Sequence, residues 1–155
     1  MNNTLLQLYL LLSNLSSNTY LVGGCVRDML LGIEPKDFDI VCDIDLDLVS
    51  QTLQKNGWKV DEAGKQFLVM IVSKNNEQFE IANFRNDGNY SDGRRPDSVS
   101  IATINEDCIR RDFTVNSLYF NPFTNQVLDP TGKGLQDLQN SQEVANAKAS
   151  CSASV

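Results

Sequence analysis

The chain has 155 residues, 41% of them hydrophobic, and its 13 basic and 20 acidic residues give a formal net charge of -7. This length suits one domain with a real core, and the acidic balance excludes binding to nucleic acid through overall charge alone. The sequence contains no histidine, which excludes mechanisms based on an imidazole base and histidine-ligated metals. Any catalysis must therefore use carboxylates, cationic side chains and a hard metal ion such as Mg²⁺.

Segments that would lead the chain to a membrane or to an oxidising compartment are not found. No apolar run is long enough to span a bilayer, and the leucine-rich start lacks the basic flank and cleavage site of a signal peptide. The four cysteines stand far apart without a C-x-x-C pair, which argues against a zinc site or a disulfide framework. We therefore expect a cytoplasmic chain with reduced thiols and no membrane partner.

The first half of the chain alternates helical and strand patterns. Apolar periodicity predicts a helix over residues 4–16 capped by Asn3 or Thr4, and "TYLVGG" then predicts a strand entering a glycine turn. "VRDMLLG" predicts a helix closed by Gly32, "KDFDIVC" a strand, and residues 45–56 a helix ending near Gly57. "KQFLVMIVS" and "EQFEIANFR" predict two strands joined by the hairpin sequence "KNNE". Together these patterns predict an α+β fold, with a mixed twisted sheet flanked by helices.

The second half begins with a long irregular segment. Residues 86–98 lose all periodicity and predict a loop, of a length that is often functional. "SVSIAT" predicts a strand, and "NEDCIRRDF" a helix with Asn105 as its N-cap and Glu106 and Asp107 in its first turn. "SLYFNP" and "QVLDP" predict a terminal strand pair. We expect one domain over residues 1–140 and a poorly ordered polar tail over residues 141–155.

Two aspartates alternate with apolar residues in "KDFDIV". In a strand, Asp37 and Asp39 would lie on one face, roughly 7 Å apart at Cα, and a neighbouring strand could deliver Glu80 beside them. Such carboxylates can hold one or two divalent ions for phosphoryl or nucleotidyl transfer. The alternative interpretation is a solvated strand face, which the D-x-D pattern alone does not exclude.

The glycine pair in "LVGGCVRDM" adds a candidate site for a phosphate. Backbone amides at Gly23 and Gly24, at the start of a helix, could hold phosphate oxygens. The Arg27 guanidinium could donate two further hydrogen bonds to the same oxygens. The alternative is a tight strand-to-helix turn with a surface arginine.

The segment "RRDFTVN" adds a third candidate. A helix would place Asp112 and Asn116 on one polar face beside Arg111, with Ile109 and Phe113 on a buried stripe. The alternative is an ordinary amphipathic helix with an internal ion pair, which the pattern of this segment alone favours.

The three elements occur in the order G-G-x-V-R-D, K-D-x-D and R-R-D-F-T-x-N. This combination resembles the catalytic head domain of class II tRNA nucleotidyltransferases and bacterial poly(A) polymerases, members of the DNA polymerase beta-like superfamily. The resemblance covers roughly Tyr20 to Leu138. It includes "FEIANFRNDGNYSDGRRPDSV", which is similar to the family's third-carboxylate strand and flexible loop, and "LDPTGKGLQDL", which is similar to the segment leading out of the head. It implies the polymerase beta-like nucleotidyltransferase fold.

The resemblance also implies chemistry: addition of CMP or AMP to tRNA or another RNA 3′ end, with ATP and CTP as substrates and two Mg²⁺ ions as cofactors. Asp28 and Arg110 would brace the helices. The residues implied for each role are Asp37 and Asp39 for the metals, Glu80 as a third catalytic carboxylate, Gly23, Gly24 and Arg27 for the triphosphate, Arg111, Asp112 and Asn116 for the ribose and its surroundings, and Tyr90, Asp92, Arg94 and Arg95 for the mobile loop used when adenosine is added.

The C-terminus departs from the family pattern, because members continue into helical neck, body and tail domains that select the nucleotide and grip the tRNA. We expect these domains to be absent, with a separate helical subunit as one replacement. Leu68 and Ser117 stand where relatives tend to have glycine and alanine.

Three hypotheses follow from the resemblance and this departure. They are a minimal or split RNA 3′-nucleotidyltransferase, an enzyme of the same fold acting on a small molecule, a protein or a tRNA end in a toxin-like role, and a non-catalytic remnant that binds nucleotide or a partner. The intact Asp37, Asp39 and Asp112 argue against the remnant. Arg94, Arg95 and the retained loop favour RNA as the acceptor.

Overall fold

The computed structural model describes residues 2–87, 99–111 and 113–141. In these residues seven strands form one sheet in the order β3-β4-β5-β2-β1-β8-β9, in which β2 and β5 are parallel and the other neighbours antiparallel. The mixed sheet flanked by helices confirms the predicted fold class. The strands are β1 (Thr19–Val22), β2 (Asp39–Cys42), β3 (Lys59–Asp61), β4 (Val69–Lys74), β5 (Glu77–Asn83), β8 (Tyr119–Asn121) and β9 (Gln126–Leu128), with β6 (Arg85–Asp87) and β7 (Val99–Ile101) forming a separate ribbon.

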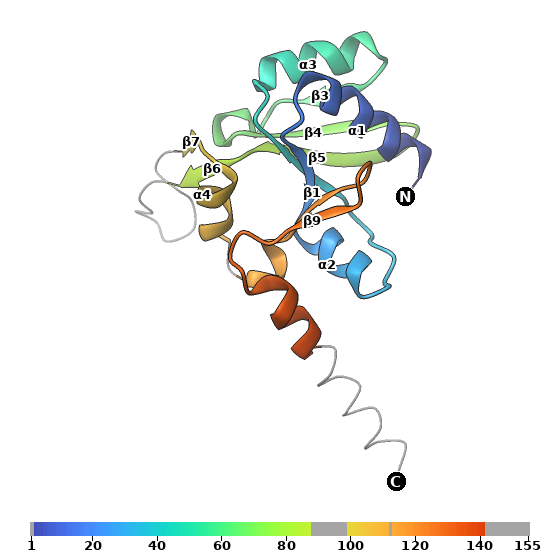
Figure 1. The fold of residues 1–155 in the computed structure, drawn as a ribbon. Helices are drawn as coiled ribbons and strands as arrows, with labels where there is room; N and C mark the ends of the chain where they lie inside the picture. The colour runs from blue at the N-terminus through green and yellow to red at the C-terminus, as the bar shows by residue number, and fades with distance from the viewer. Residues whose placement is uncertain (1, 88–98, 112, 142–155) are drawn as a thin grey trace.

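Helices flank the sheet (Figure 1), and residues of α1, α2, α3 and the helix over residues 134–141 join one core cluster, whereas α4 packs on the smaller cluster of the opposite face. None of the helices in the described part of the chain is long and apolar enough to cross a membrane. The helices are α1 (Asn3–Leu15), α2 (Gly24–Leu30), α3 (Leu46–Lys55) and α4 (Ile104–Ile109), and two 3-10 turns are η1 (Lys65–Phe67) and η2 (Thr114–Asn116).

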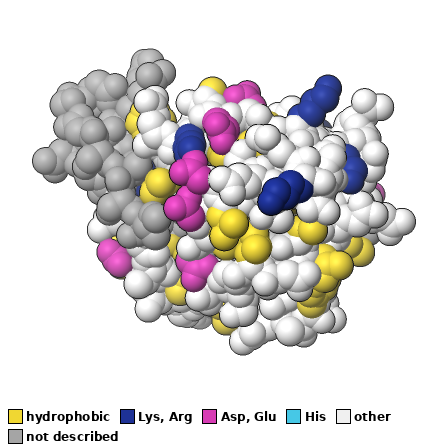
Figure 2. Space-filling model, turned by 90° about the horizontal axis from the view of Figure 1, so that it is seen from above, with side chains coloured by type: hydrophobic (Ala, Val, Ile, Leu, Met, Phe, Trp, Pro, Cys, Tyr) yellow, Lys and Arg dark blue, Asp and Glu magenta, His cyan; other side chains and the backbone are white. Residues whose placement is uncertain are grey.

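The main core lies between the sheet and the α1 and α3 helices. Strand alternation buries Ile40 and Cys42 of β2 on this side, where they join Leu8 of α1 and Val49 of α3 in one cluster. The outer surface on this side, seen in Figure 2, has acidic and basic side chains interspersed. The opposite face of the sheet carries a smaller cluster that includes Val41, and it is this face that also presents Asp39.

Local sequence signals explain several of the turns. The hairpin between β4 and β5 pairs Lys74 with Glu77, and the two asparagines between them have φ values of 55° and 60°, as a tight hairpin requires. Gly32 closes α2 at φ 74°, and the Ile33 amide donates to the Asp28 carbonyl at 2.8 Å. Both predictions are confirmed.

The structure corrects both predicted N-caps. The first helix is capped by Asn2, whose side chain accepts a hydrogen bond from the Leu5 amide, and not by Asn3 or Thr4. The helix α4 is capped by Thr103, whose hydroxyl accepts from the Glu106 amide while the Glu106 carboxylate accepts from the Thr103 amide. Asn105 therefore lies inside the helix, because this reciprocal capping box begins two residues earlier.

Other parts of the secondary structure also differ from the prediction. The segment "KQFLVMIVS" begins with the turn η1, because Leu68 adopts a left-handed conformation (φ 61°) that stops a strand before Val69. The short β3 was not predicted. Residues 86 and 87, expected in a loop over 86–98, belong to β6 instead, and residues 88–98 and the expected tail over 142–155 lie outside the described residues.

The described cysteines are buried free thiols. Cys25, Cys42 and Cys108 carry no disulfide, as the sequence spacing predicted. Burial raises the pKa of Cys42 to about 11, so this thiol stays protonated at neutral pH.

Candidate active site

One row of the sheet brings two carboxylates side by side. β2 and β5 run parallel with Asp39 opposite Glu80, and on the other side of Asp39 lies Val22 of β1. Residues paired across neighbouring strands share a face of the sheet, so both carboxylates project from the face opposite α1 and α3. The register therefore brings Glu80 next to Asp39, as strand alternation predicted.

Asp37 reaches this region from outside the strand. The expected strand over residues 36–42 is shorter, because β1 ends at Val22, the partner of Asp39, and the chain then turns into α2. Asp37 is exposed in the preceding segment, so the prediction that both aspartates share a strand face is wrong. The two still line one hollow together with Gly24 and Arg27.

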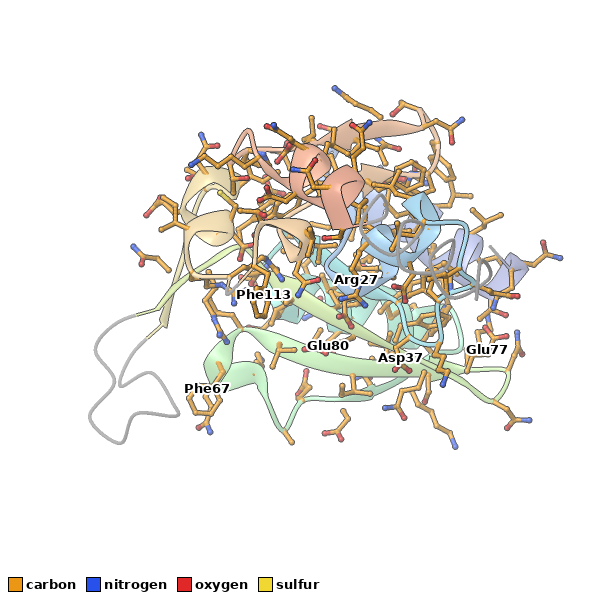
Figure 3. All side chains as sticks on the ribbon, turned by 90° about the horizontal axis from the view of Figure 1, so that it is seen from below. Arg27, Asp37, Phe67, Glu77, Glu80 and Phe113 are labelled. Atoms are coloured by element: carbon orange, nitrogen blue, oxygen red, sulfur yellow. The ribbon has the colours of Figure 1, made fainter. Side chains whose placement is uncertain are left out.

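Figure 3 shows how these side chains are distributed over the lower face of the molecule. Arg27, Asp37 and Glu80 lie in its middle part together with Phe113, whereas Glu77 and Phe67 lie towards its two ends. A second hollow contains Asp39, Glu80 and Arg111, and Asp39 also lines the first. Asp39 is therefore the residue that joins the two hollows.

The carboxylates disfavour one another's charge. Burial raises the pKa of Asp39 to about 6, the neighbouring Glu80 and Asp37 add to this shift, and Arg111 opposes it. In the described part of the chain, no three acidic or thiol side chains gather into a complete metal cluster. Mg²⁺ commonly binds through one or two carboxylates, with water and substrate phosphates completing its shell. Asp39, with Asp37 or Glu80, fits such an ion, because it would offset the excess negative charge.

The glycine turn borders the same carboxylate. Gly23 has φ 81° and ψ -142°, a conformation open to glycine, and it precedes the first residue of α2. A Cβ atom on Gly23 would lie 4.0 Å from both Arg111 Nη1 and Asp39 Oδ2. A Cβ atom on Gly24 would lie 3.3 Å from Arg27 Nη2. The turn thus leaves space between a carboxylate and two guanidinium groups.

Arg27 joins two segments that are far apart in the sequence. Its Nη1 donates to Asn116 Oδ1 of η2 at 3.1 Å, and its Nε donates to Asp28 Oδ1 at 3.1 Å. The structure therefore places two of the predicted nucleotide-binding residues, Arg27 and Asn116, in direct contact. Asp28 accepts the Nε bond from its neighbour within α2, so this bond does not test the bracing of helices expected for Asp28.

The segment "RRDFTVN" is not helical throughout, which corrects the prediction. α4 ends at Ile109, Phe113 is extended, and η2 follows at Thr114. Ile109 is 79% exposed and Phe113 64%, so the expected buried stripe does not form. The physical reason is that the inner side of α4 is occupied by Asp107, which binds the two arginines that follow it and leaves Ile109 on the outside.

Arg111 is held on its protein side by Asp107. Its Nε and Nη2 both donate to Asp107 Oδ2 at 3.1 Å, and its guanidinium carbon lies 5.8 Å from the centre of the Tyr119 ring. Sequence reasoning assigned Asp107 only to the first turn of the helix and missed this contact. The spacing of Asp107 to Arg110 and Arg111, three and four residues, is the signal that could have found it.

Five of the predicted site residues lie outside the described residues. They are Asp112 of the nucleotide-binding group and the four loop residues Tyr90, Asp92, Arg94 and Arg95.

Comparisons with known proteins give a consistent result. The family described as "Poly A polymerase head domain" matches residues 19–143. The chain is 35% identical over 132 residues to poly(A) polymerase I of Haemophilus influenzae, a match that covers 77% of this chain and 28% of the relative. It is 38% identical over 121 residues to the CCA-adding enzyme of Bacillus pumilus, covering 77% and 29%. The chain thus spans less than a third of these curated relatives.

Solved structures share the fold. The CCA-adding enzyme of Bacillus stearothermophilus in complex with CTP aligns with a TM-score of 0.71 and 25% identity over 90% of this chain and 32% of that one. A tRNA nucleotidyltransferase complexed with a primer tRNA and an incoming ATP analog aligns with a TM-score of 0.61 and 30% identity over 78% of this chain and 33% of that one.

Proposed function

The chain belongs to the poly(A) polymerase head-domain family of class II nucleotidyltransferases, and we propose that it transfers nucleotides from nucleoside triphosphates to RNA 3′ ends without a template. The observation that carries this proposal is the convergence of carboxylates, glycine turn and arginines on two hollows that share Asp39. A site that combines crowded negative charge with guanidinium groups suits a metal-bound triphosphate.

In the proposed reaction the RNA 3′-hydroxyl loses its proton to solvent and its oxygen bonds to the α-phosphorus, while the bond to the leaving pyrophosphate breaks. Mg²⁺, when bound by Asp37 and Asp39 with Glu80 beside them, supplies Lewis-acid stabilisation of the attacking and leaving oxygens. The carboxylates themselves fix where the cation and the reacting phosphate meet. Two ions would match the two-metal pattern of such transfers.

The phosphates of the nucleotide would lie against the glycine turn. Gly23 and Gly24 offer backbone amides without side chains in the way, and Arg27 lines the same hollow as Asp37 and Asp39. Arg27 Nη1 is fixed by Asn116, which orients the guanidinium towards one position. A preorganised guanidinium stabilises the charge that develops on phosphate oxygens more than a mobile one does.

The sugar and the base would lie on the η2 side of the site. We assign Arg111 and Asn116 to this part, together with Asp112, whose assignment rests on the sequence resemblance alone. The assignment of Tyr90, Asp92, Arg94 and Arg95 to a loop used for adenosine addition rests on the same resemblance.

The acceptor and the nucleotide are proposed from relatives. Solved relatives are described with CTP, and with a primer tRNA and an ATP analog, so we propose ATP and CTP as substrates and a tRNA 3′ end as acceptor. Identities of 35% to a poly(A) polymerase and 38% to a CCA-adding enzyme do not separate the two activities. RNA and nucleoside triphosphates meet in the cytoplasm, which is the compartment we propose.

The experiment is a transfer assay with Mg²⁺, each labelled nucleoside triphosphate in turn, and tRNA lacking its terminal CCA. Addition of C and then A would support CCA synthesis, and ATP-only ladders would support poly(A) synthesis. Absence of transfer to any RNA, with triphosphate binding retained, would contradict RNA as the acceptor.

Matched variants connect this assay to the site. Glu80→Gln should slow transfer, whereas Glu77→Gln, on the same strand and towards the end of the face in Figure 3, should not. Equal effects of the two changes would contradict the assignment of Glu80.

A further inference from the structure

Asp107 is a buried charged residue that the reaction itself does not use. Its side chain is 0% exposed, and both of its carboxylate oxygens accept hydrogen bonds from protein donors. Burial by itself raises the pKa of this carboxyl, but Arg111, the Tyr119 hydroxyl and Arg110 outweigh it and hold the pKa below its ordinary value. Asp107 is therefore a carboxylate at neutral pH. Burying this charge costs desolvation free energy, which its hydrogen bonds and ion pairs must offset.

The two oxygens of Asp107 receive donors from three elements. Oδ1 accepts from the backbone amide of Arg85 at 3.0 Å and from Arg110 Nε at 3.1 Å. Oδ2 accepts from the Tyr119 hydroxyl at 2.5 Å and from both Nε and Nη2 of Arg111 at 3.1 Å. These bonds tie α4 to the start of β6 and to β8, so the carboxylate itself cannot rotate without breaking several of them.

The contact with Arg111 leaves one part of the guanidinium for other partners. Nε and Nη2 are engaged by Asp107, and Nη1 lies on the side of Gly23 and Asp39. Tyr119 adds a second contact, because its ring centre lies 5.8 Å from the guanidinium carbon while its hydroxyl donates to the same carboxylate. The direction of Nη1 is thus set by groups on its far side.

We propose that Asp107 is a positioning residue for nucleotide transfer, which holds the Arg111 guanidinium so that Nη1 faces the glycine turn and Asp39. This inference rests on the proposed function, since it assigns Asp107 to the orientation of a nucleotide-binding arginine. A purely structural role would give Asp107 the same hydrogen bonds, so the two roles must be separated by their effect on Arg111.

The test is a double-mutant cycle on the whole chain. Asp107→Asn keeps the shape of the side chain and removes its charge, and we expect kcat/KM for nucleotide addition to fall roughly 100-fold, as for a misplaced binding group. In an Arg111→Gln background the same change should have almost no further effect, because the residue through which Asp107 acts is already gone. Glu106→Gln, which removes a charge from the same turn of α4 but does not contact Arg111, is the matched control.

Several outcomes would overturn the inference. These are an unchanged kcat/KM in folded Asp107→Asn, an equal loss in Glu106→Gln, or additive losses in the double variant. If Asp107→Asn does not fold, Arg111→Lys decides instead, because lysine keeps the buried ion pair but cannot both hold Asp107 and reach towards Gly23. A kcat/KM equal to that of the wild type in Arg111→Lys would show that nucleotide transfer does not need the guanidinium orientation set by Asp107.

A measurement without catalysis separates this inference from the proposed function. In the ¹⁵N-arginine NMR spectrum, the Arg111 Nε–H signal should be protected from solvent exchange in the wild type and in Glu106→Gln, and exposed to it in Asp107→Asn. If the wild type transfers no nucleotide although this protection is present and lost as expected, the proposed function fails while the positioning stands. Rapid exchange in the wild type would overturn the positioning itself.

Discussion

Asp39 is partly buried and Asp107 fully buried, and the pKa values of these two aspartates move in opposite directions. Burial raises the pKa of Asp39 to about 6, helped by Glu80 and Asp37. Burial acts the same way on Asp107, but two arginines and the Tyr119 hydroxyl hold its pKa below the ordinary value. Burial alone would have raised both, so the neighbours decide the sign.

The contrast distinguishes Asp39, whose surroundings can accept an added cation, from Asp107, which is already paired with the protein's own cationic side chains. Both carboxylate oxygens of Asp107 already accept hydrogen bonds from protein donors. Asp107 can therefore influence the site through the orientation of the Arg111 guanidinium. Asp39 faces two other carboxylates with Arg111 as its opposing charge, which leaves negative charge that an added cation would offset. One arginine thus belongs to both sites, and the predictions below change one aspartate at a time.

The largest expected effect is on stability, from Asp107→Asn. Removing one partner of a buried ion pair leaves the other charge uncompensated and typically costs 3–5 kcal/mol, so we expect about 4 kcal/mol lower free energy of unfolding. Urea denaturation followed by circular dichroism measures it. Glu106→Gln should cost less than about 1 kcal/mol, since glutamine can still complete the capping box. Similar losses in both variants would show that Asp107 is an ordinary surface-like carboxylate.

The next effect is on activity, from Asp39→Asn. We expect nucleotide transfer to fall about 100-fold or more, which corresponds to about 2.7 kcal/mol of activation free energy. Stability at neutral pH should stay the same or increase, because the change relieves repulsion from Glu80 and Asp37. Single-turnover transfer and urea denaturation give the two numbers. A variant that loses stability but keeps its transfer rate would reverse the roles assigned to the two aspartates.

The sequence predicted the parts of this site that depend on local pattern. Apolar periodicity located α1 within a residue at each end, and the two asparagines of "KNNE" located the β4–β5 hairpin. The alternation in "FEIANF" located Glu80 on the correct face of β5. These features depend on neighbours within a few residues, which a single sequence displays.

The parts that the sequence did not predict depend on distant contacts. β2 begins at Asp39 and excludes Asp37 because β1, some twenty residues earlier, ends at the partner of Asp39. The four-residue spacing of Ile109 and Phe113 matches a helix, yet α4 ends at Ile109 and both side chains are exposed. The bonds that Asp107 accepts from Arg85 of β6 and Tyr119 of β8 join distant parts of the chain, and the local spacing of Asp107 to the two arginines after α4 contains no sign of them.

A third prediction concerns the pH dependence of stability. The folded-state pKa of Asp39 is raised, so between about pH 4 and pH 6 the native state binds more protons than the unfolded state and stability falls as pH rises. As pH rises across this range, the wild type should therefore lose about 2 kcal/mol of unfolding free energy relative to Asp39→Asn. Urea midpoints of the two proteins at several pH values measure it.

The same measurement on Asp107→Asn should give the opposite sign. The folded-state pKa of Asp107 is lowered, so its contribution is fully present above about pH 4, the ordinary value, and is lost as pH falls below it. The advantage of the wild type over Asp107→Asn should shrink only on acidification. Parallel curves for the two variants would mean that their surroundings do not differ in the way described.

The smallest effect is expected from Mg²⁺ on the folded protein without any substrate. An ion at tenfold its dissociation constant stabilises by about 1.4 kcal/mol, which would raise the melting temperature by roughly 3–6 °C. The shift should disappear in Asp39→Asn and persist in Asp107→Asn, because the first variant removes a carboxylate from the crowded site and the second leaves all of that site's carboxylates in place. Calorimetry of the three proteins with Mg²⁺ and with EDTA measures the shift. If Mg²⁺ stabilised all three equally, the cation would bind elsewhere, and the raised pKa of Asp39 would reflect only its burial among like charges.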